Sequence, residues 1–362
     1  MNVVGYNKPI LGIAFEWWSP KMIRFAILCC CIIVNVLFNG PSIAQGAGGC
    51  PSYPPVLNVS GKTFYTDTKG SQVNDAAQKE NEAKQKPIAD FLHYELESLD
   101  GTPSWSHIQG LSAPCANTLL ESWAKAGALS ATRDENGNYS SQGGIDRQVL
   151  IRSFIFVGLK LQSKGFELGP NVIPWLRKLV QHNNENWRKI SLRSNLYYWA
   201  GSIAANFALL SHDQDSLNFQ NEVWKYAMSA IRDDGVLDSE ATRGTRALVY
   251  HQYALSALLT LREARRALGL RAIDVEQRKL RVLADRVGTA LCHPETMAGI
   301  ASEKTQELPG EWGYREVAAF GKDLLSPDWT TCGVAVRNFF DINNGGDQIK
   351  NAELFHSMSK AH

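Results

Sequence analysis

The stretch Arg232–Leu255, RDDGVLDSEATRGTRALVYHQYAL, changes character half-way along its length. Its start predicts a turn at Asp233–Gly235, because two turn-forming acids precede a glycine that accepts positive φ. From about Thr245 the leucine spacing predicts a helix. Arg246 and Tyr253 stand seven positions apart, close to two helical turns, so both side chains are expected on one face. A nearby guanidinium favours the phenolate form that a tyrosine general base requires.

The same two residues also suit a purely structural interpretation. An Arg and a Tyr on a packed helix commonly bury their apolar parts and keep their polar ends in solvent. Spacing alone leaves both interpretations open, and a function for this helix needs support from elsewhere in the chain.

The composition is that of an ordinary globular protein. Of 362 residues, 44% are hydrophobic and 20% are charged, and the formal net charge is +1. This balance gives no sign of a nucleic-acid partner, and we expect none. A site for an acidic ligand can still be locally basic in a neutral chain.

After an irregular arm over residues 45–75, helical periodicity continues through most of the chain. Paired helices joined by short polar turns, without strand alternation, predict an all-α double layer in one domain. The last dozen residues are expected to be loose. Helices are predicted over 88–99, 115–129, 145–161, 174–182, 192–210, 213–231, 245–268, 274–291, 311–325 and 331–340.

The N-terminal segment has the order of a secretory signal. Two basic residues precede the apolar run Phe25–Phe38, and a small-residue site ends at Ala44. The run is shorter than the roughly 20 residues that cross a bilayer, so cleavage is expected. The sequence therefore predicts a signal peptide over 1–44, with Met22 as an alternative start, and a domain over 45–362. The expected location is periplasmic or secreted, without membrane contact after cleavage.

Cysteine usage agrees with an oxidising compartment. Three of seven cysteines lie in the leader, and an even number remains after cleavage. Sequence alone allows three pairings among Cys50, Cys115, Cys292 and Cys332. Lipid attachment at Cys50 is disfavoured, because Ala47–Gly49 lacks a large aliphatic residue.

Three blocks of sequence resemble, in the same order, the alginate lyase family (polysaccharide lyase family five, poly(beta-D-mannuronate) lyase-like). They are CANTLLESWAKAGAL at 115–129, RSNLYYWAG at 193–201, and DDGVLDSE followed by RALVYHQYAL within 233–255. The resemblance implies an (α/α) toroid, with inner and outer helices wound around a cleft. It also implies an N-terminal arm and lid over about 45–85.

The family resemblance also selects among the cysteine pairings. It favours a disulfide between Cys50 and Cys115, which ties the N-terminal arm to an early helix. Cys292 and Cys332 are then left as the second pair by elimination.

The activity that the resemblance implies is cleavage of a uronate polymer by β-elimination. This reaction needs three steps: the C6 carboxylate is neutralised, a base removes the C5 proton, and an acid protonates the departing O4. The resemblance assigns base and acid to Tyr253, with Arg246 tuning its phenol and helping to hold the substrate. It assigns the carboxylate to Asn195, whose amide can bind it without a charge of its own. No metal or organic cofactor is needed if side chains supply all three.

One departure from the family pattern bears on the substrate. The family has Asn-Asn-His-x-Tyr-Trp where this chain has Ser194–Trp199, so Leu196 replaces a histidine that helps to neutralise the carboxylate. A tyrosine alone suffices when proton and leaving group lie on one face of the sugar, as in mannuronate and glucuronate. The expected partner is therefore polymannuronate or glucuronan rather than a guluronate polymer. The alternative is a catalytically impaired polyuronate-binding protein.

Other residues are candidates for substrate contact, although tryptophans at helical spacing are more often core and scattered basic residues more often surface. Tyr65 is expected on the lid, and His107 in a loop that could approach the cleft. His251 should point elsewhere, since it lies roughly 200° around the helix from Tyr253. The full set is Trp199, Tyr198, Arg243, Arg193, Trp123, Tyr65 and His107.

A rival reading uses four acids of the quoted stretch, Asp233, Asp234, Asp238 and Glu240. Inverting glycosidases need two carboxyl groups roughly 6.5–9.5 Å apart across a cleft. Because all four come from one loop, turn formation and helix capping are the expected roles.

Overall fold

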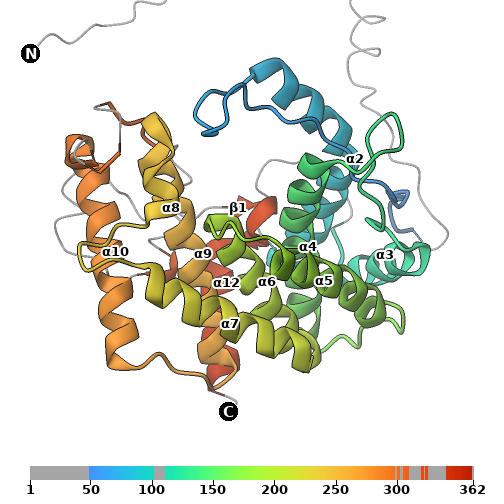
Figure 1. Cartoon of the computed structure of the whole chain (residues 1–362). Helices are drawn as coiled ribbons and strands as arrows, with labels where there is room; N and C mark the ends of the chain where they lie inside the picture. Colours follow the sequence, from blue (N-terminus) through green and yellow to red (C-terminus); the bar gives the residue numbers. More distant parts are fainter. Residues whose placement is uncertain are drawn as a thin grey trace, which may run out of the picture. The chain divides into compact units, whose positions relative to one another are not determined.

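The computed structural model describes residues 49–101, 111–297, 300–301, 305–309, 319–321, 323–324 and 340–360. From Tyr53 onward its helices pack in two layers (Figure 1). The inner helices, each packed against the next, are α2 (Asp75–Asp100), α4 (Ser141–Ser163), α6 (Asn195–Ser211), α9 (Ala247–Ala267) and α12 (Gln348–Ser359). The outer helices are α3 (Ala113–Ala126), α5 (Val172–Lys189), α7 (Gln214–Ala230) and α10 (Asp274–Cys292). The predicted all-α double layer is confirmed.

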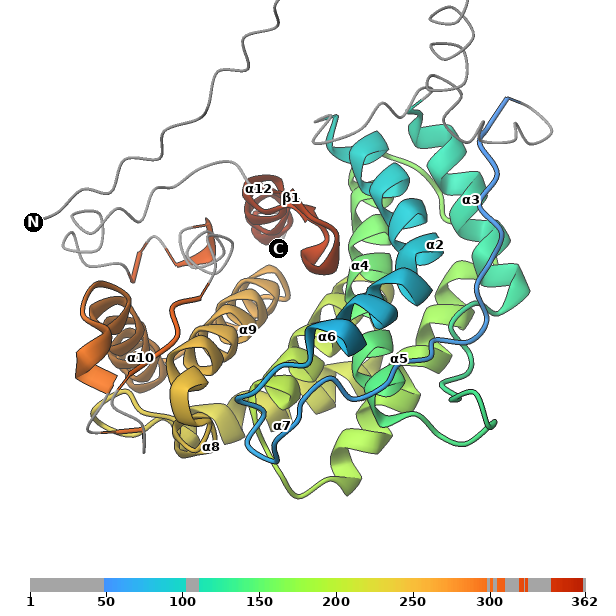
Figure 2. The ribbon, with the colours of Figure 1, turned by 90° about the horizontal axis from the view of Figure 1, so that it is seen from above.

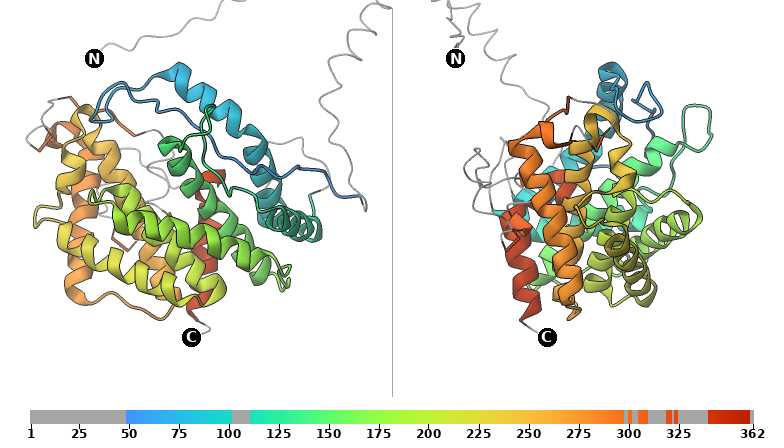
Figure 3. Two further views of the ribbon diagram at one scale, coloured as in Figure 1. Left: turned by 45° about the vertical axis from the view of Figure 1, so that its right-hand side comes forward. Right: turned by 60° about the vertical axis from the view of Figure 1, so that its left-hand side comes forward.

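The outer helices pack on the inner ones, and α5 and α7 each cover a junction between two of them. Helix α5 packs on α4 and α6, α7 packs on α6 and α9, and α10 packs on α9, as the two views of Figure 3 also show. The layers approach closely at Gly201 of α6, where a Cβ would lie 2.5 Å from Val223 Cγ1 on α7. A larger residue there would force α6 and α7 apart.

A short hairpin joins the last helix to the first ones. Strands β1 (Phe340–Asp341) and β2 (Gly346–Asp347) pair antiparallel, and the segment lies between α12, α2 and α4 (Figure 2). It is anchored by Asp100, which pairs with Lys160 of α4 at 2.6 Å and accepts a 2.9 Å hydrogen bond from the Asp347 amide. Both charges of the pair are buried, so removing either would leave the other uncompensated.

The first helix is longer than predicted. Helix α2 begins at Asp75 rather than Ile88, at the end of the irregular arm that was predicted over 45–75. The Asn74 side chain caps it by accepting a 3.1 Å hydrogen bond from the Ala77 amide. The first three turns are mostly polar, and without an apolar stripe they gave no periodic signal.

The expectation of a loose C-terminus is wrong. Asp347 caps α12 by accepting from the amides of Ile349 and Lys350. Leu354 and Phe355 are then buried against the inner layer. Most of the helices predicted over 311–325 and 331–340 lies outside the described residues.

The predicted Cys50–Cys115 disulfide is present. Cys292 is also disulfide-bonded, whereas Cys332, its predicted partner, lies outside the described residues. Among the helices that the structure describes, none is both long and apolar enough to cross a membrane.

Candidate active site

A cavity of about 670 Å³ opens among the inner helices. Its walls come from α4, α6 and the first half of α9, and the arm and the C-terminal hairpin complete them. The lining residues are Thr63, Phe64, Tyr65, Ser141, Gln142, Ile145, Gln148, Val149, Arg152, Asn195, Leu196, Trp199, Ile203, Arg243, Tyr250, Tyr253, Phe340, Asp341, Asn343 and Asn344. The cavity therefore brings together five residues selected from the sequence: Asn195, Trp199, Arg243, Tyr253 and Tyr65.

The α6 wall contains the side-chain amide of Asn195, whose orientation is fixed by hydrogen bonds to Glu240. Asn195 is the first residue of α6, and its backbone N–H donates to Glu240 Oε1 at 2.7 Å. Its side-chain Nδ2 donates to Glu240 Oε2 at 3.2 Å. The contact shows that the Nδ2 atom of the Asn195 amide faces Glu240. One of its two N–H groups is used there, and the second can bind an acidic ligand. Leu196 follows on the same wall, beside Asn195, as the sequence reasoning required.

Glu240 has a role that sequence reasoning missed. Its carboxyl is fully buried, and burial raises its pKa while Arg243 and Asn195 oppose the increase. Arg243 Nε lies 3.8 Å from Glu240 Oε2. One carboxyl thus holds both a cavity amide and a cavity guanidinium, rather than capping a turn. The spacing of Glu240 three residues before Arg243 was the available signal. The other acids of that loop are exposed and pair with Arg232 and Lys279.

The α9 wall presents two tyrosines one turn apart. The rings of Tyr250 and Tyr253 lie 5.8 Å apart at 83°. The Tyr250 hydroxyl lies 2.8 Å from the Tyr65 hydroxyl and 3.3 Å from the Gly70 carbonyl oxygen. The arm therefore covers the cavity at Tyr250 through Tyr65, the aromatic residue that the sequence analysis expected on a lid.

Two guanidinium groups surround Tyr250. The Cζ atoms of Arg243 and Arg246 lie 4.6 Å and 5.5 Å from the centre of its ring. Burial raises the pKa of Tyr250, as does Tyr65, whereas the two arginines oppose the increase. Tyr250 was not among the residues selected from the sequence. The signal was present, because Arg243 precedes Tyr250 by the same seven positions that separate Arg246 from Tyr253.

Arg246 lies beside the cavity rather than in its wall. It belongs to the 3₁₀ turn before α9, and Nη1 donates to the Tyr65 hydroxyl at 3.3 Å. Its Nε lies 3.2 Å from Glu307 Oε2. The assignment of the proton transfer to Tyr253, with Arg246 as its tuning group, stays a prediction.

Three residues selected from the sequence lie away from the cavity. Trp123 is fully buried, stacks on Phe91 at 4.1 Å and donates its indole N–H to the Tyr53 carbonyl, which contradicts its predicted contact with substrate. Tyr198 is also fully buried, on the face of α6 that turns away from the cavity, and the same correction applies. Arg193 lies over the Tyr197 ring at 4.2 Å and outside the cavity wall.

No histidine lies among the described residues of the cavity wall. His251 is buried, accepts from the Leu237 amide at Nε2 and contacts the Ala247 carbonyl through Nδ1, so it points elsewhere as predicted. His107 lies outside the described residues.

Trp199 carries a cation on its face. The Arg152 guanidinium carbon lies 3.8 Å from the centre of the Trp199 ring, and Arg152 Nε donates to the Asn343 carbonyl at 2.7 Å. Sequence reasoning missed Arg152, although a basic residue within the apolar run 145–161 was a usable signal.

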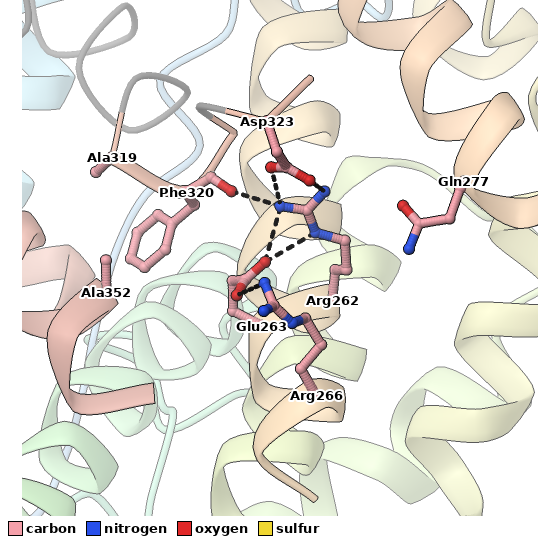
Figure 4. Close-up of a pocket in the computed structure, with 8 residues that line it drawn as sticks. All are labelled: Arg262, Glu263, Arg266, Gln277, Ala319, Phe320, Asp323 and Ala352. Atoms are coloured by element: carbon pink, nitrogen blue, oxygen red, sulfur yellow. Dashed lines mark hydrogen bonds and ion pairs between the residues drawn. The ribbon is translucent and has the colours of Figure 1, made fainter. Parts of the chain in front are cut away.

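A second pocket, of about 390 Å³, lies at the other end of α9 (Figure 4). Arg262 is buried there and binds Asp323 and Glu263 at 2.8 Å each, and Arg266 binds Glu263 at 3.0 Å. These guanidinium groups already have carboxylate partners, so the pocket offers little to an acidic ligand.

Comparison with known proteins identifies related sequences and a shared fold. The chain is 29% identical over 234 residues to a polysaccharide lyase of Stenotrophomonas maltophilia, covering 62% of this chain and 68% of that protein. It is 25% identical over 287 residues to an alginate lyase of Pseudomonas aeruginosa, covering 73% and 72%. The structure of alginate lyase A1-III from Sphingomonas species A1 superposes with a TM-score of 0.61 at 19% identity, covering 86% of each chain. A structure of A1-III complexed with a tetrasaccharide gives a TM-score of 0.64 at 20% identity, covering 86% and 87%. These neighbours have the (α/α) toroid fold that the sequence resemblance implied.

The family model "Alginate lyase" matches residues 113–297, which contain α3 to α10 and with them Asn195, Glu240 and Tyr250. Because this match covers just over half of the chain, the protein belongs to the alginate lyase family and is a polysaccharide lyase.

Proposed function

We propose that this lyase cleaves mannuronate-rich alginate, or glucuronan, by syn β-elimination in the cavity between α4, α6 and α9. The observation that carries the proposal is the meeting of a carboxylate-binding amide, Asn195, with tyrosine hydroxyls across one cavity. Relatives whose printed names are alginate lyase support an acidic polysaccharide as substrate.

Syn elimination requires one group on one face of the sugar to take the C5 proton and return a proton to O4. A tyrosine can do both, because its hydroxyl oxygen is a donor and an acceptor. Both Tyr250 and Tyr253 line the cavity. The electrostatic argument that selected Tyr253 from the sequence applies to Tyr250 as well, since two guanidinium groups lie against the Tyr250 ring, and we propose Tyr250 as the group that transfers the proton.

The substrate class follows from the group next to Asn195. Leu196 cannot move a proton, so the described wall offers no histidine for removing a proton from the face opposite the leaving group. Mannuronate and glucuronate present proton and leaving group on one face, whereas guluronate does not. The cavity is therefore suited to the first two sugars.

The test is an assay of the secreted chain on polymannuronate, glucuronan and polyguluronate, following the ultraviolet absorbance of the new C4=C5 double bond. We expect turnover on polymannuronate or glucuronan and little on polyguluronate. Binding of all three polymers without any absorbance change would instead identify a polyuronate-binding protein.

We also propose export to the periplasm or beyond, followed by cleavage near Ala44. The oxidised state of Cys50, Cys115 and Cys292 supports an oxidising compartment. N-terminal sequencing of the mature protein from a periplasmic fraction should begin within a few residues of position 45, and a retained Phe25–Phe38 run would contradict cleavage.

A further inference from the structure

Arg152 is a buried cation in the wall of the cavity. It lies on α4, in a run of largely apolar residues, and is 5% exposed. Burying a guanidinium is costly unless the protein supplies compensating contacts. Here the Asn343 carbonyl accepts from Nε and from Nη2, and the Trp199 ring lies under the guanidinium plane. Two separate segments, α6 and the C-terminal hairpin, therefore hold this cation at the cavity.

One carboxyl, that of Asp341, lies in the cavity wall close enough to interact with the Arg152 guanidinium. Asp341 of β1 also lines the cavity, and burial raises its pKa although Arg152 opposes the increase. Its oxygens accept from the Asn343 amide at 2.9 Å and from Asn344 Nδ2. The amide contacts of Asp341 thus occupy oxygens of the one carboxyl among the described residues of the cavity wall, beside the Arg152 guanidinium.

Neutralisation of the sugar carboxylate is favoured by a positive group near it. Asn195 supplies a donor without charge, and the adjacent Leu196 supplies neither. Trp199 lies four residues after Asn195 on the same face of α6, a helix rise of about 6 Å, and the Arg152 guanidinium lies over its ring. Arg243, the other cavity arginine, faces Glu240 and the Tyr250 ring on the opposite wall.

We propose that Arg152 binds the C6 carboxylate of the uronate whose C5 proton is removed, together with Asn195. The inference rests on the proposed function and assigns the charge that Leu196 lacks. A guanidinium presents paired N–H groups that match a carboxylate. The ring of Trp199 then acts on that face as a support for Arg152, rather than as a surface for a sugar ring.

The first experiment compares Arg152→Gln with Arg147→Gln. Arg147 lies on the same helix and is equally buried, at 5% exposure, but it does not line the cavity. Arg152→Gln should lower kcat/KM on the preferred polymer by at least 100-fold, and Arg147→Gln by less than 5-fold, in variants that remain folded by circular dichroism. Arg152→Lys, which keeps the charge but loses the paired geometry, should fall between Arg152→Gln and the wild type.

The second experiment asks whether a histidine at position 196 does the same work. Leu196→His places a donor beside Asn195, so in the Arg152→Gln background it should restore kcat/KM at least 10-fold. The factor gained there should exceed the factor gained in the wild-type background by at least 10-fold, because both groups would serve one carboxylate. Equal factors in the two backgrounds would overturn the proposal, as would an Arg152→Gln loss no larger than that of Arg147→Gln.

Failure of the proposed function would appear differently. If the wild type is inactive on every uronate polymer, calorimetry with a mannuronate tetramer still tests Arg152. Binding at least 10-fold weaker in Arg152→Gln than in Arg147→Gln would support the carboxylate contact, and equal Kd values would overturn it. Should Arg152→Gln fail to fold, Arg152→Lys provides the same comparison with the charge retained.

Discussion

The two ends of α9 carry arginines in opposite surroundings. At the start, Arg243 and Arg246 lie against the Tyr250 ring, and their nearest carboxylate oxygens are at 3.8 Å and 3.2 Å. At the end, Arg262 and Arg266 are bound by Glu263 and Asp323 at 2.8–3.0 Å (Figure 4).

The difference shows that the partners of an arginine decide its chemistry. A guanidinium bound by two carboxylates has its charge cancelled within the chain, and the pair serves packing. A guanidinium beside aromatic rings keeps its charge available to tune a phenol or to bind an anion. We therefore expect the residues at the start of α9 to act in catalysis and those at its end to act in stability.

The largest effect should come from removing one hydroxyl at the catalytic end. Tyr250→Phe keeps the ring packing and should lower kcat by about 10²–10⁴-fold, the usual contribution of a general acid–base group. Tyr253→Phe is the matched control one turn away, and we expect a loss below 10-fold. The reverse ranking, measured by double-bond absorbance on the preferred polymer, would return the proton transfer to Tyr253.

Removing the Glu240 carboxyl, which contacts Asn195 and Arg243, should have the next largest effect on kcat. Glu240→Gln keeps the size of the side chain but weakens its hold on Asn195 and Arg243, so kcat should fall roughly 10–100-fold with a smaller change in KM. Glu263→Gln makes the same chemical change at the other end of α9 and should leave kcat within 3-fold. If both variants lose activity equally, the distinction between the two ends does not hold.

A substitution at the C-terminal end of α9 should lower stability and leave kcat unchanged. Arg262→Met removes a guanidinium that is 2% exposed and leaves Glu263, at 14% side-chain exposure, with Arg266 as its remaining partner. The free energy of unfolding should fall by about 1–3 kcal/mol, because Asp323 is exposed enough to be rehydrated. The kcat of the folded variant should match that of the wild type, and denaturant melts with parallel kinetics test both statements.

The smallest effect concerns pH. Burial lowers the pKa of His251 to about 4, below the 6.5 of an unfolded histidine. Between these values the unfolded chain binds the extra proton, so this residue makes stability fall as pH drops from 6.5 toward 4. His251→Gln should flatten the pH dependence of the unfolding free energy in that window by up to about one proton. An unchanged slope would mean that His251 does not titrate with unfolding.

The sequence determined the layered helices and the neighbourhood of Asn195, because each depends on local periodicity or on a short block. The Cys50–Cys115 bond was implied by the family resemblance, since the sequence alone left three pairings open. It failed where the local signal was weak or ambiguous. The polar start of α2 shows no apolar stripe, and α12 is held by Asp347 and by contacts with distant helices. Such long-range contacts leave no periodic trace in the sequence.

The candidate site also has a part that the sequence could predict and a part that depends on tertiary contacts. Two Arg–Tyr pairs with the same seven-residue spacing overlap at the start of α9, and nothing local distinguishes Arg243–Tyr250 from Arg246–Tyr253. Only the tertiary structure adds a difference, because the hydroxyl of Tyr65, 185 positions before Tyr250, lies 2.8 Å from the hydroxyl of Tyr250. The placement of Arg152 on Trp199 likewise required α4, α6 and the hairpin to pack together. Helical phase is a local property, whereas the charges and hydroxyls that face one cavity are set by which distant elements close around it.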